Sequence, residues 1–453
     1  MSDFGALSVG LSGLQAHRRA LDVTGHNLAN VNTPGYSRQR VDLSPVTNPT
    51  TANIFARSSA AGTGVRAGTA YRLHDQFVEI RALQEHGVGG ALKQSQAVLG
   101  QIEMAVNEPS DTGLASQINR FMAAWDDVAN RPDDLSARQQ LVELGKTLAA
   151  DFAQLDGSLG ALAQNTGRQL EATVSDINAA AVAVADLNNR VLAAVNADIP
   201  AGDLMDQRDV MIRNLADLAG VTVRPQENGV VDVYLGTTAL VRGNRPEALR
   251  VDVTTTPGTT AVVWDRLGVS AAAGGQLSAL QGAVNSTIPA YRAQLTAVQL
   301  QLTSDVNTVH ASGFDLSGTP GLAFFQMGPG GIAVNPIIAS DPTKVAAAAT
   351  PTGLRDGSVA GQIADLTGPG SAYNAMVLHL GIESRTVNRQ AATQSLVTEQ
   401  VDSAREATSG VNIDEEMTNM IAIQHAYNAS ARFITAVDSM LETLIRSTGL
   451  VGR

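Results

Sequence analysis

The 453-residue chain contains no cysteine. Disulfide bridges and thiolate chemistry are therefore excluded, and a zinc site could use only histidine and carboxylate ligands. Aromatic residues make up only 4% of the sequence, although 44% of it is hydrophobic. Alanine, leucine and valine must then fill the core, which favours closely packed helices over a thick β-sandwich.

Basic residues are too few to balance the acidic ones, and the net charge is −12. Nucleic-acid binding needs a basic face, so we expect no nucleic-acid partner. Hydrophobic runs stay well short of the roughly 18 residues of a transmembrane helix, so we expect no membrane insertion. The N-terminus also lacks a basic stretch followed by an unbroken apolar one, and we expect no cleaved secretory signal.

Residue patterns typical of catalysis are missing as well. The seven histidines are scattered, and no two stand four residues apart around a glutamate, as they do in zinc proteases. Gly328-Pro329-Gly330-Gly331 lacks the Lys-Ser/Thr of a phosphate-binding loop and predicts a turn. Paired acids such as Glu415-Glu416 diverge by about 100° on a helix and suit a helix start. We therefore expect no enzyme, with no catalytic residue, cofactor or metal.

What the chain does have is an apolar heptad stripe at each end. In residues 4–28, large apolar side chains recur at steps of three and four, interrupted by Arg18 and Gly25. This pattern predicts a coiled-coil helix. Four glycines weaken it by about 1 kcal/mol each relative to alanine, so we expect the helix to form once a partner covers its stripe. The stripe comprises Phe4, Leu7, Leu11, Leu14, Leu21 and Leu28.

A turn is predicted directly after this helix. In Thr33-Pro34-Gly35-Tyr36, proline at the second position and glycine at the third suit a type II turn, because glycine accepts a positive φ there. Asn30, Pro34, Gly35 and Tyr36 complete the predicted N-terminal assembly residues.

The C-terminal helix carries clearer signals. Asn412 is a predicted N-cap, and the acids that follow it suit a helix start. Methionines in its stripe fit either ordinary core or an adaptable binding surface, and the terminal location favours the second. The predicted assembly residues here are Ile413, Met417, Met420, Tyr427, Ile434, Val437, Leu441 and Leu444.

Between the two ends the periodicity changes from helix to strand and back. Asn228-Gly229 joins two β-branched runs and predicts a hairpin. Residues 313–370 are rich in glycine and proline. The sequence leaves open whether they complete the β region or cover the helices. Helices are predicted around residues 71–86, 114–125, 135–162, 177–191 and 275–311, and strands around 221–223, 230–235, 249–253 and 261–264.

These patterns predict a mainly α fold with an inserted β domain, an α+β class. Residues 1–60 with 400–453 would form a terminal helical coiled-coil domain for assembly. A long-helix bundle would comprise 61–212 with 272–312 and 371–399. A small antiparallel β domain would comprise 213–271, with or without 313–370.

Motifs at both ends resemble the signatures of bacterial flagellar axial proteins. They are Leu11–Ala16 with Asn27–Gln39, and Val411–Met417 with Gln424–Arg432. Two internal stretches, Asp203–Asp209 and Asn307–Gly318, are similar to the hook-associated protein 1 family. The similarity follows the whole chain in order, although the middle is shorter than in longer relatives.

The resemblance implies a structural adaptor at the hook–filament junction, secreted by the flagellar type III apparatus without a cleaved signal peptide. It implies three assembly partners: the hook protein, a second junction protein (hook-associated protein 3) and further copies of the chain in a ring. It also implies a cytosolic export chaperone on the C-terminal helix. Two alternatives stay open. The first is another flagellar axial protein, such as the hook protein or a distal rod protein, and the second is a secreted peptidoglycan hydrolase with assembly tails.

Overall fold

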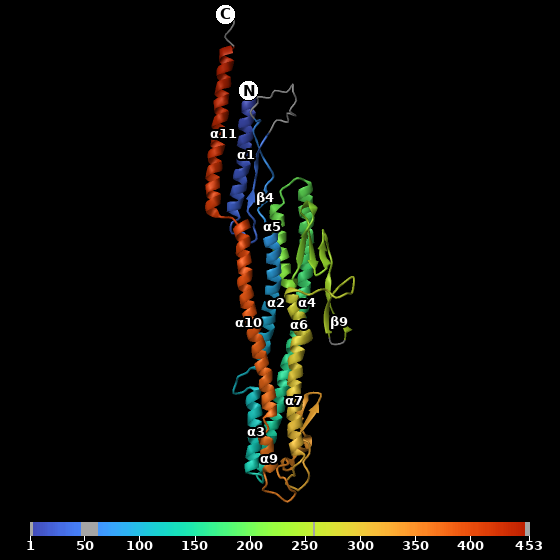
Figure 1. Cartoon of the computed structure of the whole chain (residues 1–453). Coiled ribbons are helices and arrows are strands. Elements are labelled where there is room, and N and C mark those ends of the chain that lie inside the picture. The colour runs from blue at the N-terminus through green and yellow to red at the C-terminus, as the bar shows by residue number, and fades with distance from the viewer. Residues whose placement is uncertain (1–2, 47–61, 257–258, 449–453) are drawn as a thin grey trace.

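The computed structural model describes residues 3–46, 62–256 and 259–448. The molecule is a long, mostly helical rod whose helices run along its length (Figure 1). None of the described helices combines the length and the apolar character needed to cross a membrane. The body of the rod contains α2 (Gln76–Val106), α3 (Leu114–Asn130), α4 (Leu135–Asn196), α5 (Gly202–Ala219), α6 (Gly275–Gly282), α7 (Ile288–His310) and α10 (Gly368–Ser409).

The longest helix, α4, replaces the two helices predicted at 135–162 and 177–191. It runs for 62 residues without interruption, or about 93 Å at 1.5 Å per residue. Gly157 lies near the end of the first predicted segment and Gly167 lies between the two, but a Cβ on either would meet nothing within 4 Å. These glycines weaken the helix without breaking its hydrogen bonds, and buried Leu170 and Val174 carry the apolar stripe across the gap.

Two hydrophobic cores lie along the rod. The first is built from α3, α7, the first half of α4 and the adjoining ends of α2 and α10. It gathers most of the chain's buried rings, among them Phe121 and Trp125 at 6.3 Å between centroids. The second core joins α5, α6 and the second half of α4 to the β region. A short π-helical turn, Ala283–Thr287, carries the chain from α6 into α7.

Residues 313–364 lie on the first core, where Phe324, Val345 and Ile363 are buried. The structure thus places most of the segment left open above against the helices. The predicted turn at Gly328–Gly331 joins a two-stranded hairpin, with Gly331 at φ +95°. This cover contains β11 (Phe325–Gly328), β12 (Gly331–Val334), α8 (Pro336–Ser340), a 3-10 turn at Pro342–Lys344 and α9 (Ser358–Ala364).

The β region packs on the second half of α4. Its main sheet is antiparallel in the order β5-β6-β7-β8, and β9 pairs with β10 beside it. The predicted hairpin at Asn228-Gly229 is present, with φ values of +65° and +75°. The strands are β5 (Thr222–Pro225), β6 (Val231–Leu235), β7 (Thr238–Arg242), β8 (Arg245–Pro246), β9 (Leu249–Thr256) and β10 (Thr259–Trp264), with a 3-10 turn at Glu227–Gly229.

The two ends of the chain meet at one end of the rod. Helix α1 (Asp3–Ala29) packs antiparallel against α11 (Ile413–Thr448), and we call these two helices the tail pair (Figure 1). Four short strands that the sequence did not predict lie beside it. They are β1 (Gln39–Arg40), β2 (Leu43–Pro45), β3 (Val65–Ala67) and β4 (Tyr71–Arg72), with β1 paired to β4 and β2 to β3.

Candidate assembly interface

Two glycines of α1 allow the helices of the tail pair to pack closely. A Cβ on Gly10 would lie 2.7 Å from Ile434 Cγ1, and one on Gly13 would lie 3.1 Å from Ser430 Oγ. These glycines weaken α1 as an isolated helix, yet they allow its backbone to approach α11 closely. The same residues therefore disfavour the free helix and favour the pair.

The face that α1 buries is made of small and polar residues. Gly10, Gly13, Ala16, Thr24 and Asn27 are buried. With 3.6 residues per turn, the predicted leucine stripe lies roughly 120° around the helix from the centre of this face. Leu7, Leu14, Leu21 and Leu28 are half-buried, and Leu11 is 48% exposed.

The leucine stripe therefore lies to one side of the small and polar face at which α1 comes closest to α11 of its own chain. Contact of these leucines with other subunits stays a prediction.

The predicted residues of α11 divide between the inner face and the surface. Val437 is buried, and Met420, Tyr427, Ile434 and Leu441 are half-buried. Ile413, Met417 and Leu444 are 46%, 45% and 52% exposed. Because Ile434 lies beside Gly10, the last turns of α11 extend past the start of α1 (Figure 1). Apolar residues outside the predicted set are also exposed along α11, namely Ile421, Phe433, Met440 and Ile445.

The turn after α1 has the predicted geometry. The Tyr36 backbone N–H donates to the Thr33 carbonyl at 3.1 Å, and Gly35 has φ +79°. A type II turn is thus confirmed. Pro34 is exposed, and Asn30 donates a side-chain hydrogen bond to the carbonyl one turn earlier. A Cβ on Gly35 would lie only 2.3 Å from Val210 Cγ2, so the turn rests directly on α5.

A polar network ties the base of α1 to the base of α11. The Asn27 side chain forms a hydrogen-bond pair with the Gln39 backbone, at 2.9 Å for both bonds, and donates to Glu416 at 3.1 Å. The Tyr36 hydroxyl donates to the Asn27 amide oxygen at 2.8 Å. Burial, followed by the charge of Asp203, raises the pKa of Tyr36 above its usual value, so the hydroxyl stays protonated. This network fixes where the two helices begin to pair.

Arg38 extends this network to both acids of the Glu415-Glu416 pair. Arg38 forms ion pairs with Glu415 at 2.8 Å and with Glu416 at 2.6 Å, and Glu416 is only 3% exposed. Glu416 is therefore part of a buried contact and not a solvated helix start. The predicted N-cap is confirmed, because the Asn412 side-chain oxygen accepts from the N–H groups of the second and third residues after it at 2.9 and 3.3 Å.

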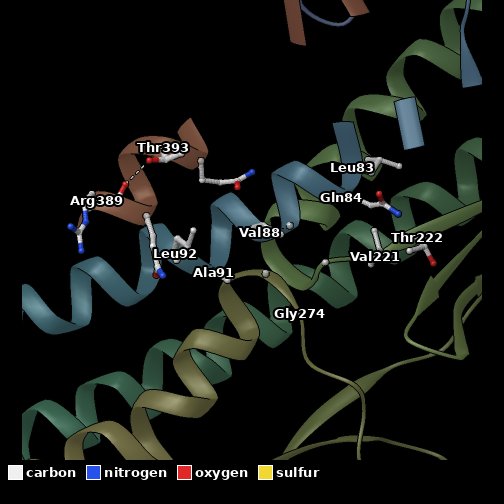
Figure 2. A pocket seen from close by; sticks show the side chains of 15 residues that line it. Leu83, Gln84, Val88, Ala91, Leu92, Val221, Thr222, Gly274, Arg389 and Thr393 are labelled. Atoms are coloured by element: carbon white, nitrogen blue, oxygen red, sulfur yellow. Dashed lines mark hydrogen bonds between the residues drawn. The ribbon is translucent and has the colours of Figure 1, made fainter. Parts of the chain in front are cut away.

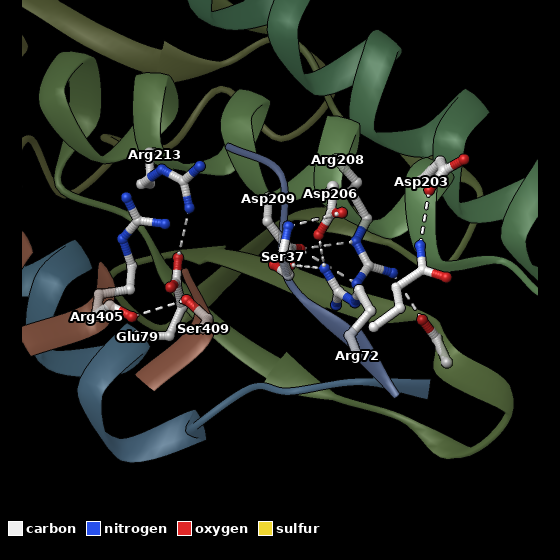
Figure 3. Close-up of polar contacts among 12 residues, drawn as sticks. Ser37, Arg72, Glu79, Asp203, Asp206, Arg208, Asp209, Arg213, Arg405 and Ser409 are labelled. Atoms are coloured by element: carbon white, nitrogen blue, oxygen red, sulfur yellow. Dashed lines mark hydrogen bonds and ion pairs between the residues drawn. The ribbon is translucent and has the colours of Figure 1, made fainter. Parts of the chain in front are cut away.

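The stretch 203–209 joins the helical body to the segments beside the tail pair (Figure 3). Arg72, which precedes α2, donates to Asp206 at 2.7 Å and to Asp209 at 2.9 Å. The backbone N–H of Ser37 donates to Asp206 at 3.1 Å, and Gln39 donates to Asp203 at 2.9 Å.

These contacts explain a motif to which the sequence assigned only a family resemblance. Burial alone would lower the pKa of Arg72, but the two carboxylates outweigh it and raise that pKa. The signal available in the sequence was the spacing of Asp203, Asp206 and Asp209, which puts three acids on one face of a predicted helix.

The stretch 307–318 has a different role. Asn307 forms two hydrogen bonds with the Phe325 backbone, at 2.8 and 2.9 Å. His310 is fully buried, accepts from the Ala346 N–H at 2.8 Å through Nε2 and donates from Nδ1 to the Leu322 carbonyl. Burial lowers the pKa of His310 to about 4, so its ring is neutral at pH 7. These residues fasten the 313–364 cover to the first core.

A groove of about 950 Å³ opens between α2 and α10 (Figure 2). Its floor is mostly apolar, with Leu83, Val88 and Leu92 from α2 and Val221 from the start of the β region, while Arg389 lies at its rim. The lining contains neither paired carboxylates nor a nucleophile beside a base. Within residues 3–46, 62–256 and 259–448, no group of three or more histidine and acidic side chains could hold a metal ion.

Comparison with known families identifies the chain. A family model described as the flagellar hook-associated protein FlgK helical domain matches residues 99–325, which is half of the chain. The chain belongs to the FlgK family. Two further models match the tails of this FlgK-family chain: flagella basal body rod protein at residues 7–36, and flagellar basal body rod FlgEFG protein C-terminal at residues 404–447.

Relatives of this FlgK-family chain include flagellar hook-associated protein 1 of Bacillus subtilis (strain 168), 28% identical over the full length of both chains. The protein of the same name from Escherichia coli (strain K12) is 23% identical, over 96% of this chain and 98% of that one. A solved structure of the flagellar hook junction protein FlgK from Burkholderia pseudomallei matches with a TM-score of 0.49 and 28% identity. That match covers 55% of this chain and 46% of the other.

Family membership makes this chain a structural protein of the bacterial flagellum. The predicted fold class, mainly α with small antiparallel sheets, is confirmed. The three matched ranges also follow the structure. Residues 7–36 cover most of α1 and the turn, 404–447 cover the end of α10 with α11, and 99–325 cover most of the body.

Proposed function

We propose that this FlgK-family protein is the adaptor at the hook–filament junction, assembled through its N- and C-terminal helices. The observation that carries the proposal is the tail pair, whose helices still present apolar side chains to solvent after they have packed on each other. Full-length similarity to proteins named flagellar hook-associated protein 1 supports the junction over other places in the flagellum.

The exposed stripes favour several neighbours at once. Full burial of a leucine side chain stabilises a fold or complex by about 1.5–3 kcal/mol. Burial of the remaining exposed surface of a half-buried leucine therefore adds roughly 1 kcal/mol. The five leucines of α1 together offer roughly 5 kcal/mol, while association costs about 4–15 kcal/mol in lost freedom. One such contact is marginal, and a ring of copies in which each tail pair has two or more neighbours is favoured.

The partners that we propose are the hook protein on one side, a second junction protein (hook-associated protein 3) on the other, and further copies within the ring. The domain division given above is part of this proposal, with residues 62–72 counted with the tails because β3 and β4 pair with β2 and β1. The tails would face the axis, and the bundle and β domains would lie outside them. We further propose export through the type III apparatus without a cleaved signal peptide, with a cytosolic chaperone on α11 until export.

We propose no catalytic activity. A peptidoglycan hydrolase would need two carboxylates in a cleft about 5–10 Å apart, and the groove between α2 and α10 is lined by no such pair. Incubation of the purified protein with peptidoglycan tests this point, since release of soluble fragments would restore the hydrolase alternative.

The decisive experiment is deletion of the gene, followed by electron microscopy of the cells. We expect hooks without filaments and filament subunits released into the medium. Labelled antibody then places the protein: signal at the hook tip supports the junction, whereas signal along the whole hook supports the alternative of a hook protein. Normal filaments on the deletion strain would refute both the adaptor role and its place.

A further inference from the structure

The direction of the tail pair is not fixed by the covalent chain. The described chain passes between tail and body twice, at Leu73–Asp75 before α2 and at Gly410–Asn412 between α10 and α11. Neither passage is helical. Because two short extended connections allow rotation, contacts between side chains must determine the angle at which the tails leave the body.

Those contacts converge on the N-terminal half of α5. Asp203, Asp206 and Val210 follow one another at steps of three and four, which places them on one face of the helix. Figure 3 shows this face turned toward Ser37 and Arg72, which come from the tail side. We call Asp203, Asp206, Asp209 and Val210 the α5 platform.

The ionic part of the platform is shielded from water. The side chains of Arg72, Asp206 and Asp209 are 10%, 7% and 15% exposed, and one guanidinium nitrogen contacts both carboxylates. Removal of one partner from a buried ion pair leaves an uncompensated charge, so these contacts resist any rotation that would separate them. Ser37 adds direction, because its backbone N–H meets Asp206 only when the chain runs across α5 as observed.

The steric part of the platform is Val210, against which the turn at Gly35 packs. Gly35 lies so close to Val210 that any side chain at position 35 would collide with it. The turn is thus held against α5 by shape while Arg72 and Ser37 hold the adjoining chain by charge and hydrogen bonding. Two different kinds of contact fix the same joint.

We propose that the α5 platform is the positioning element that sets the direction of the tail pair relative to the helical body. The proposal rests on the proposed function, because the tail pair is taken there as the axial part of the assembly. It assigns a role to the motif at 203–209: that motif orients the tails.

The absence of cysteine allows a direct test. Spin labels are attached to cysteines introduced at Asn189 on α4 and Ala429 on α11, both exposed positions. The distance between them is measured by double electron–electron resonance on the full-length protein. We expect one narrow distance peak, and loss of that peak in Asp206→Ala. Circular dichroism shows whether the body of the variant is still folded.

Asp315→Ala is the matched control. Asp315 pairs with Lys344 at 3.0 Å and its side chain is only 2% exposed, but both residues belong to the 313–364 cover of the first core and not to the joint with the tails. The control is expected to lower stability and keep the narrow peak. Gly35→Ala tests the steric contact independently: it should shift the peak, and adding Val210→Ala should return the peak toward its original position.

The outcomes separate this proposal from the proposed function, since no hook or filament is present in the measurement. An unchanged narrow peak in both Asp206→Ala and Gly35→Ala would overturn the positioning role. A broad distribution in the unsubstituted protein, or equal broadening in Asp315→Ala, would overturn it too. If Asp206→Ala unfolds the body, the response of Gly35→Ala decides.

Discussion

Replacement of two glycines in α1 by alanine should have opposite effects on the tail pair. Alanine is favoured over glycine inside a helix by about 1 kcal/mol. At Gly25 a Cβ would meet nothing within 4 Å, so Gly25→Ala should stabilise α1 by roughly that amount. At Gly10 the new methyl group would lie 2.7 Å from Ile434 and 3.1 Å from Phe433. Overpacking of this kind costs about 1–3 kcal/mol, which cancels or exceeds the gain.

Hydrogen exchange of the α1 and α11 amides measures the difference. Slower exchange is expected in Gly25→Ala, and faster exchange in both helices is expected in Gly10→Ala. Ile434→Ala supplies a double-mutant cycle: with the methyl groups of Ile434 removed, Gly10→Ala should become neutral or stabilising. If Gly10→Ala slows exchange as much as Gly25→Ala does, the close approach of α1 and α11 at Gly10 is wrong.

Three further predictions concern assembly, the turn and pH. Leu14→Asp and Leu441→Asp should each abolish incorporation into flagella while circular dichroism of the body is unchanged; normal incorporation of both would contradict the interface. Gly35→Val should impair motility, because valine disfavours φ +79° and would collide with Val210; unchanged swimming would count against it. The pKa of His310 falls from 6.5 in the unfolded chain to about 4 in the folded protein. The contribution of the neutral ring to the free energy of unfolding is therefore complete above pH 6.5. It declines as the pH falls toward 4, by roughly 3 kcal/mol in total; urea unfolding should show this decline and lose it in His310→Gln.

Local signals in the sequence predicted the elements that depend on local chemistry. Asn412 was identified as a cap, Gly35 as the third position of a type II turn and Asn228-Gly229 as a hairpin, because each needs only its own backbone geometry. The four strands β1 to β4 were not predicted. Their pairing joins residues about thirty apart in the chain, as with Gln39 and Arg72, and such short strands carry almost no periodicity.

The assembly surface shows a second limit of sequence reasoning. Heptad counting gives weight to large apolar residues, and it therefore selected the leucine stripe of α1. Within one chain the closest packing is instead made by Gly10 and Gly13, whose small size lets two backbones approach. Similarly, the acids of 203–209 look like ordinary surface residues until the fold brings Ser37 and Arg72 to them.

Continuity of the helices between the two cores gives the rod a mechanical character. α2, α4 and the α6–α7 run each contribute buried residues to both cores, so three lengths of helix cross the boundary between them. A twist or bending force applied at the tail joint would pass along uninterrupted backbone hydrogen bonds to the far end near α3 and α9. The body would then bend very little as a unit. Most of the bending between tails and body would occur at the short passages beside the α5 platform.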